Sequence, residues 1–190
     1  MTKTQKRIII TFLVMTLIIL IAFKLQNKIL KNVFPIEYQE YVYKYSEQYN
    51  IDPLIIFSII KAESNFNPIV VSKSEAIGLM QLLEPTAQEI ANKTNYITIT
   101  KEKLFEPELN IMLGTKYFSD LLKLYEGNTL LALTAYNAGQ GNVKNWIEKG
   151  IIKPDGTDIE NIPFKETNNY VRKILRNYRM YKQIYISKQT

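Results

Sequence analysis

A single carboxylate, Glu63, ends a run of isoleucines in the segment FSIIKAESNFNP, residues 57–68. In a helix, Ile56, Ile59 and Ile60 lie on the same face as this acid, because residues three, four and seven apart line up. Apolar neighbours disfavour a charged carboxylate, and so does the negative end of a helix dipole, so we expect a raised pKa for Glu63. An acid that stays protonated near neutral pH can serve as a general acid. The simpler interpretation is a helix-end glutamate that extends into water.

Three other segments carry side chains that could serve beside this acid, and each also has a plain structural interpretation. In SKSEAIGLMQ, the glycine could let the backbone come close to a ligand, with one apolar and one polar side chain beside it. The same residues are equally typical of a turn that leads into a helix. AYNAGQGNVKNW places a phenol and an amide at a helix end, where a satisfied tyrosine is the simpler explanation. IPFKETNNYV begins a helix with an acid and has a tyrosine one turn on, which is typical of a dipole partner and a core residue. The side chains concerned are Gly78, Met80, Gln81, Tyr136, Asn137, Glu166 and Tyr170.

The chain contains no histidine and no cysteine. This composition excludes a Ser-His-Asp triad, HExxH zinc chemistry, thiol nucleophiles and disulfides. Any catalysis must therefore use carboxylates, hydroxyls, amides or lysine. With 190 residues, we expect one domain with its own core and an appendage.

The net charge of +6 comes from the first 32 residues. That segment holds six basic residues and no acid, so 18 of the 24 basic residues remain to balance all 18 acids. A balanced domain gives little support to nucleic-acid binding, and a basic last helix is more often a solvated face. We therefore expect no nucleic-acid partner. The six basic residues are Lys3, Lys6, Arg7, Lys24, Lys28 and Lys31.

Residues 8–23, IIITFLVMTLIILIAF, form an uncharged run with two threonines among apolar side chains. Such a run is typical of a signal-peptide core or a short membrane span. No small-x-small cleavage site follows it, which favours an uncleaved anchor. Positive charge flanks both ends, so charge alone leaves the orientation open. We expect residues 1–32 to form a membrane anchor with its juxtamembrane segment, and residues 33–190 to form the folded domain.

The remainder of the chain has the pattern of a helical protein, without internal repeats or convincing strand alternation. Asp52 should cap a helix that has Pro53 at its first position and runs toward residue 64. We expect a mainly α domain, with one short β-like stretch, YITIT, at 96–100. Helix ends are expected at Gly127, Gly139 and Gly150, and further helices at 35–50, 85–94, 107–126, 129–138, 141–149 and 166–185.

In this order and spacing, the quoted segments together resemble the soluble lytic transglycosylase (SLT) family, whose fold is similar to that of goose-type lysozyme. The resemblance covers residues 35–185 and implies a lysozyme-like helical domain without metal or cofactor. Members of the family cleave peptidoglycan glycan strands between N-acetylmuramic acid (MurNAc) and N-acetylglucosamine (GlcNAc). The resemblance implies that Glu63 is the catalytic acid and base. It also implies substrate contacts for Ser64, Ser72, Gly78, Leu79, Met80, Gln81, Tyr136, Asn137, Glu166 and Tyr170.

Ordinary glycosidases use two carboxylates, whereas the resemblance implies a reaction with one. Glu63 would protonate the glycosidic oxygen and then help the C6 hydroxyl of muramic acid attack C1, with the N-acetyl group assisting departure. The expected product is a 1,6-anhydromuramoyl end. Two acids depart from the family pattern, because Glu75 stands where glycine is common and Glu84 where proline is common. Either could activate water near the groove, although solvated loop positions are the simpler expectation.

We thus expect a single-pass membrane protein whose enzymatic domain acts on peptidoglycan glycan strands outside the cytoplasmic membrane. One alternative is a goose-type muramidase, which would leave reducing ends. Another is a non-catalytic glycan-binding scaffold of the cell wall. A protein that only binds glycans would not need an acid on an apolar stripe, which argues against this alternative. Cell-wall and secretion machinery are the partner classes that this leaves open.

Overall fold

The protein is mainly α-helical in its structure, a computed structural model that describes residues 1–94 and 98–186. Within these residues there is no strand, and the only β pairing consists of two isolated antiparallel bridges, Val71 to Ile77 and Ile77 to Leu82. The mainly α prediction is confirmed. The helices are α1 (Lys3–Val33), α2 (Gln39–Tyr49), α3 (Pro53–Glu63), α4 (Glu84–Asn92), α5 (Pro107–Leu124), α6 (Thr129–Ala138), α7 (Gln140–Glu148) and α8 (Lys165–Tyr185), with short 3₁₀ turns at Lys103–Phe105 and Ile159–Asn161.

The predicted helix boundaries agree with the structure to within a few residues. The largest difference is at the start of α2, predicted from residue 35 and observed from Gln39, because Tyr38 adopts a left-handed conformation at φ +55°. Of the predicted β-like stretch, residues 96 and 97 lie outside the described part of the chain, and residues 98–100 form neither helix nor strand. The three glycines expected at helix ends all have positive φ.

Helix α3 lies in the core of the domain. The side chain of Asp52 caps its first turn by accepting a hydrogen bond from the backbone N–H of Leu54 (2.8 Å), and Pro53 occupies the first helical position. All residues from Leu54 to Ile60 are buried, because α3 packs against both α2 and α8. The helix ends at Glu63. A rigid, fully packed helix therefore presents the predicted acid.

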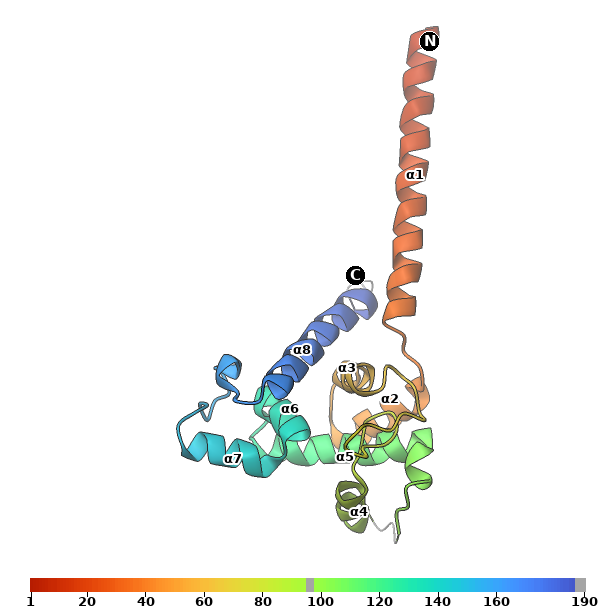
Figure 1. The fold of residues 1–190 in the computed structure, drawn as a ribbon. Coiled ribbons are helices and arrows are strands. Elements are labelled where there is room, and N and C mark those ends of the chain that lie inside the picture. The colour runs from red at the N-terminus through yellow and green to blue at the C-terminus, as the bar shows by residue number, and fades with distance from the viewer. Residues whose placement is uncertain (95–97, 187–190) are drawn as a thin grey trace.

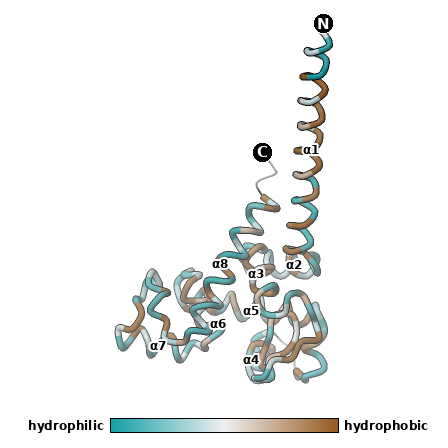
Figure 2. The backbone as a smooth tube through the Cα atoms, turned by 45° about the horizontal axis from the view of Figure 1, so that its top comes forward, coloured by the Kyte–Doolittle hydropathy of each residue, from teal (hydrophilic) through white to brown (hydrophobic). Residues whose placement is uncertain are grey.

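Helix α1 stands apart from the rest of the molecule (Figure 1). None of its residues is buried, and its central part is strongly apolar, as the hydropathy colouring shows (Figure 2). The helix extends beyond the predicted apolar run at 8–23 in both directions. By length and composition, it is the one described helix that could cross a membrane.

Candidate active site

A cleft of about 540 Å³ opens beside the C-terminal end of α3. Its walls come from the loop that follows α3, the start of α4, the middle of α5, the end of α6 and the start of α8. The cleft thus gathers segments that are far apart in the sequence. It is lined by Glu63, Ser72, Ser74, Ala76, Gln81, Leu82, Leu83, Thr86, Tyr117, Tyr136, Asn137, Ala138, Gly139, Phe164, Glu166 and Thr167.

The carboxyl group of Glu63 lies in this cleft at the last residue of α3. Burial raises its pKa from the ordinary value of 4.5 to about 7, and the nearby charge of Glu166 acts in the same direction. A hydrogen bond from Tyr170 and the positive charge of Lys173 oppose this rise but do not cancel it. At neutral pH the group is therefore divided between its acid and base forms, which suits a residue that first donates and then accepts a proton.

Tyr170 holds the acid in place from the first turns of α8. Its hydroxyl donates a hydrogen bond to Oε1 of Glu63 at 2.7 Å, and its side chain is almost fully buried. Burial, followed by the charge of Glu63, raises the pKa of the phenol well above 10, so the group stays a proton donor. The structure thus brings together Glu63 and Tyr170, two residues predicted from separate motifs.

Tyr136, at the end of α6, lies close to the acid but bonds elsewhere. Its hydroxyl donates a hydrogen bond to the carbonyl oxygen of Met80 (2.8 Å), and its ring packs against Tyr117 at 5.2 Å between centroids. Burial raises the pKa of the Tyr136 phenol, and the charge of Glu63 adds to this effect. The tyrosine therefore fixes the loop that forms one cleft wall.

The loop at residues 77–82 is held from beneath by side chains of the core. Ser64 donates a hydrogen bond to the carbonyl of Leu79 (2.9 Å), and Asn110 binds the loop through both its oxygen and its nitrogen. Gly78, at φ +79°, has no room for a Cβ, which would lie 2.4 Å from the side-chain nitrogen of Asn110. The loop is thus built as part of the core.

Five residues expected to contact substrate do not line the cleft. Tyr170 is buried and bonds to Glu63. The other four are Ser64, Gly78, Leu79 and Met80. Their side chains or Cα atoms are buried, because they tie the loop to α3 and α5. The resemblance assigned the whole motif to the groove, whereas within it only the Gln81 side chain reaches the cleft, and that side chain also donates to the carbonyls of Val70 and Gly78. Glycan contact by these four residues stays a prediction.

The remaining predicted residues, Ser72, Asn137 and Glu166, line the cleft. Thr167, which was not predicted, donates a hydrogen bond from its hydroxyl to the side-chain oxygen of Asn137 (2.7 Å). This bond occupies the amide oxygen and leaves the amide nitrogen to donate. Sequence patterns offered no signal for Thr167, because a threonine in the first turn of a helix is commonplace.

The two acids that depart from the family pattern, Glu75 and Glu84, are absent from the cleft walls. Glu75 is exposed, forms an ion pair with Lys101 (3.1 Å) and adopts a left-handed conformation at φ +62°, where glycine is favoured. Glu84 begins α4. The expectation of a solvated loop position is confirmed for Glu75 and wrong for Glu84, which is half-buried in the first turn of a helix. Neither acid lines the cleft that holds Glu63.

Residues 40–156 match the family model described as "Transglycosylase SLT domain". The match covers more than half of the chain and includes Glu63, the loop at residues 77–82 and Tyr136. The chain belongs to the SLT transglycosylase family.

Similar proteins support this assignment. The chain is 35% identical over 156 residues to a putative soluble lytic murein transglycosylase of Haemophilus influenzae, covering 82% of this chain and 26% of that protein. It is 40% identical over 116 residues to membrane-bound lytic murein transglycosylase C of Edwardsiella ictaluri, covering 56% of this chain and 32% of that protein. An inactive mutant of the lytic transglycosylase Slt from Pseudomonas aeruginosa has a similar structure, with a TM-score of 0.73 and 33% identity over 79% of this chain and 24% of that chain. The chain therefore spans about a quarter to a third of the length of these relatives.

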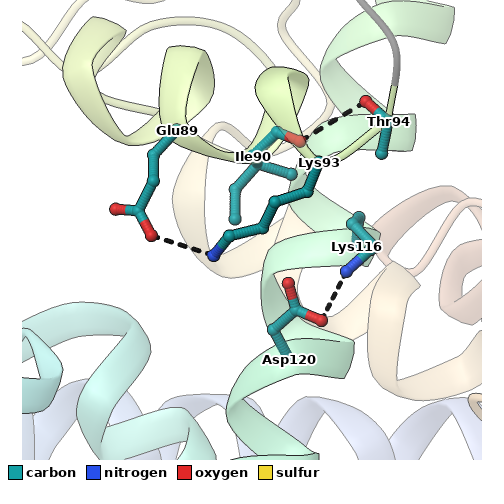
Figure 3. Close-up of polar contacts among 6 residues, drawn as sticks. All are labelled: Glu89, Ile90, Lys93, Thr94, Lys116 and Asp120. Atoms are coloured by element: carbon teal, nitrogen blue, oxygen red, sulfur yellow. Dashed lines mark hydrogen bonds and ion pairs between the residues drawn. The ribbon is translucent and has the colours of Figure 1, made fainter.

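The SLT cleft continues past Tyr117 and Gly139 into a hollow of about 460 Å³ between α4 and α5. Two ion pairs lie beside this extension (Figure 3). One joins Lys93 and Glu89 at the end of α4, and the other joins Lys116 and Asp120 in α5. A groove that runs on past the acid suits an extended polymer. Another hollow, of about 560 Å³, lies between α2, α3 and α5, but no residue predicted for the site lines it.

Replacing Tyr170 by Phe should move the alkaline limb of the pH–rate profile for glycan cleavage to higher pH, by roughly one unit. The Tyr170 hydroxyl lowers the pKa of Glu63, so its loss raises that pKa and keeps the acid protonated at higher pH. Initial cleavage rates between pH 5 and 9 measure this shift. Tyr178→Phe, which removes a hydroxyl bonded to Asp52 outside the cleft, is the matched control. A limb that stays in place or moves to lower pH would contradict the role given to Tyr170.

Proposed function

We propose that this chain is a membrane-anchored lytic transglycosylase that cleaves the MurNAc–GlcNAc β-1,4 bond of peptidoglycan. One observation carries the proposal, namely a carboxyl group with a pKa of about 7 at the end of a packed helix inside a long cleft. Membership of the SLT family supports the substrate class, since the relatives are named as murein transglycosylases. The balanced charge of residues 33–190 agrees with a glycan rather than a nucleic-acid substrate.

In this proposal Glu63 acts twice. In its protonated form it donates to the glycosidic oxygen, so that the bond to C1 breaks and the GlcNAc hydroxyl leaves. The resulting carboxylate then takes the proton of the C6 hydroxyl of the same muramic acid while that oxygen attacks C1. No water is consumed, and the acid returns to its starting form. A pKa near neutrality keeps the cost of both proton transfers low.

Other side chains around Glu63 would position the acid or the sugar. The Tyr170 hydroxyl stabilises the carboxylate form that exists between the two steps, because it already donates to Oε1 at 2.7 Å. Thr167 donates a hydrogen bond to the side-chain oxygen of Asn137. The amide nitrogen of Asn137 can therefore donate to an acceptor on the sugar, such as an acetamido carbonyl. Ser72 and Gln81 offer further polar contacts on the facing wall.

A muramidase remains the second candidate because one further carboxylate, Glu166, lies on the described cleft wall. If Glu166 activated a water molecule, the product would carry a reducing end. A transglycosylase leaves a 1,6-anhydro end, which is lighter by one water. We expect mass spectrometry of the muropeptides released from purified peptidoglycan to show anhydro ends. The muropeptides released by the Glu166→Gln variant should carry the same kind of end. Products with reducing ends that disappear in Glu166→Gln would instead establish the muramidase.

The anchor belongs to the same proposal. Helix α1 is long and apolar enough to cross a bilayer, and peptidoglycan lies outside the cytoplasmic membrane. We therefore place the folded domain on the extracytoplasmic side, on a single-pass anchor. The relative named membrane-bound lytic murein transglycosylase C supports membrane association in the family.

A further inference from the structure

The exposed face of α8 is basic from its first turns to its end. Arg172, Arg176 and Arg179 lie three or four residues apart and are exposed, opposite the buried side chains that face α3. Glu166 is the only acid in the helix. Among the described residues, none of the ion pairs involves a basic side chain of α8. This face therefore carries uncompensated positive charge.

The end of α8 is fastened to the base of α1. The hydroxyl of Tyr181 donates to the carbonyl of Pro35 (2.8 Å), and that of Tyr185 donates to the carbonyl of Phe34 (2.7 Å). The ammonium group of Lys31 lies 5.8 Å from the centre of the Tyr185 ring. These contacts tie the chain just after α1 to the end of α8, which favours one orientation of the domain relative to α1.

This orientation brings the C-terminal end of α8 close to the side on which the membrane would lie. In Figures 1 and 2 the C-terminal end of α8 lies beside the lower end of α1, and the body of the domain lies on the side away from the N-terminus. Residues 24–33 of α1 continue about 15 Å beyond the apolar run, and headgroups occupy about 5 to 8 Å of this distance. The end of α8 is thus within reach of the headgroups, given a Debye length of about 8 Å and the length of an arginine side chain.

We propose that the basic face of α8 docks on the anionic phospholipid headgroups of the bilayer that holds α1. The inference rests on the proposed anchor and commits to lipid phosphate as the occupant, because the charge is positive and the end of α8 lies against the base of α1. Lys24, Lys28 and Lys31 at the base of α1 would meet the same headgroups. The domain would then lie against the membrane at two places, through α1 and through α8, with the cleft in a fixed direction.

The test uses the full chain in lipid nanodiscs made of phosphatidylcholine alone or mixed with phosphatidylglycerol. Because the chain has no cysteine, an Ile186→Cys substitution at the exposed end of α8 gives one labelling site for a fluorophore. We expect stronger quenching by a headgroup-attached quencher in the anionic discs, weakened by high salt. Adding Arg176→Gln, Arg179→Gln and Lys182→Gln should lower the ratio of docked to undocked protein at least about tenfold, since each cation near an anionic surface contributes about fivefold.

The matched control removes the same charge far from the membrane. The control replaces three exposed lysines in and after α7, which is remote from α1 in Figure 1. It should leave the quenching unchanged, and its substitutions are Lys144→Gln, Lys149→Gln and Lys153→Gln. Equal quenching in both lipids, or equal loss in both triple variants, would overturn the proposal. A chain that enters neither kind of disc would overturn the anchor and this inference together, while the mass of the muropeptides still reports separately on the enzymatic proposal.

Discussion

Replacing Glu63 by Gln should lower glycan cleavage by about a hundredfold to ten-thousandfold, because glutamine can neither protonate the glycosidic oxygen nor accept the proton of the attacking hydroxyl. The side chain keeps its size and can still accept the hydrogen bond from Tyr170. Release of soluble muropeptides from purified peptidoglycan measures the effect. Cleavage retained at the wild-type rate would remove Glu63 from the mechanism, and a glycan-binding scaffold would then be the better reading of the cleft.

The same variant should be more stable than the wild type above neutral pH. The native state raises the pKa of Glu63 from 4.5 to about 7, so between these values it binds more protons than the unfolded chain. The contribution of this group to stability is therefore fully present below pH 4.5 and is lost as the pH rises to about 7. We expect Glu63→Gln to be more stable by about 1 to 3 kcal/mol at pH 8, measured by urea unfolding. A variant that loses both activity and stability would show damage to the fold rather than to the chemistry.

Replacing Asn110 by Ala should destabilise the protein by about 2 to 4 kcal/mol, since it leaves the buried N–H of Met80 without a partner and removes a side-chain hydrogen bond from the carbonyls of Ile77 and Leu104. The Asn110 oxygen accepts from the N–H of Met80 (2.8 Å), and its nitrogen donates to the carbonyls of Ile77 (3.0 Å) and Leu104 (2.8 Å). The side chain is fully buried in α5. Urea unfolding at constant pH measures the loss.

The Asn110 substitution should also lower glycan cleavage. Both Gln81 and the partner of the Tyr136 hydroxyl belong to the loop that Asn110 holds, so loosening the loop disturbs one wall of the cleft. Asn145→Ala, at an exposed position in α7, is the matched control and should change stability by no more than about 0.5 kcal/mol. An unchanged unfolding midpoint for Asn110→Ala would show that other contacts hold the loop.

Much of the fold follows from local signals in the sequence. Asp52 and Pro53 mark the start of α3, and the isoleucines after them indicate its buried face. The same stripe predicts the raised pKa of Glu63, because burial in an apolar helix face is enough to disfavour the carboxylate. The spacing of apolar residues and the helix caps depend only on residues close together in the sequence. The predictions for α3 agree with the structure for this reason.

The network beneath the cleft follows from no local signal. Asn110 lies in the first turn of an ordinary amphipathic helix, and only the folded chain shows that it binds a loop about thirty residues earlier. The motif around Met80 reads as a surface turn, yet the loop closes on Ser64 and on the Tyr136 hydroxyl. Such pairs depend on how α3, α5 and α6 pack together, and the packing is set by the whole core.

Helix α8 connects the proposed catalytic acid to the base of α1. Near one end Tyr170 bonds to Glu63, and near the other Tyr185 bonds to the chain just after α1. The two tyrosines are fifteen residues apart, so a rigid spacer of about 22 Å separates the acid from the anchor. If the chain is anchored and active as proposed, this spacer keeps the catalytic acid within a fixed reach of the membrane, so the enzyme would act on the strands of the wall nearest to it.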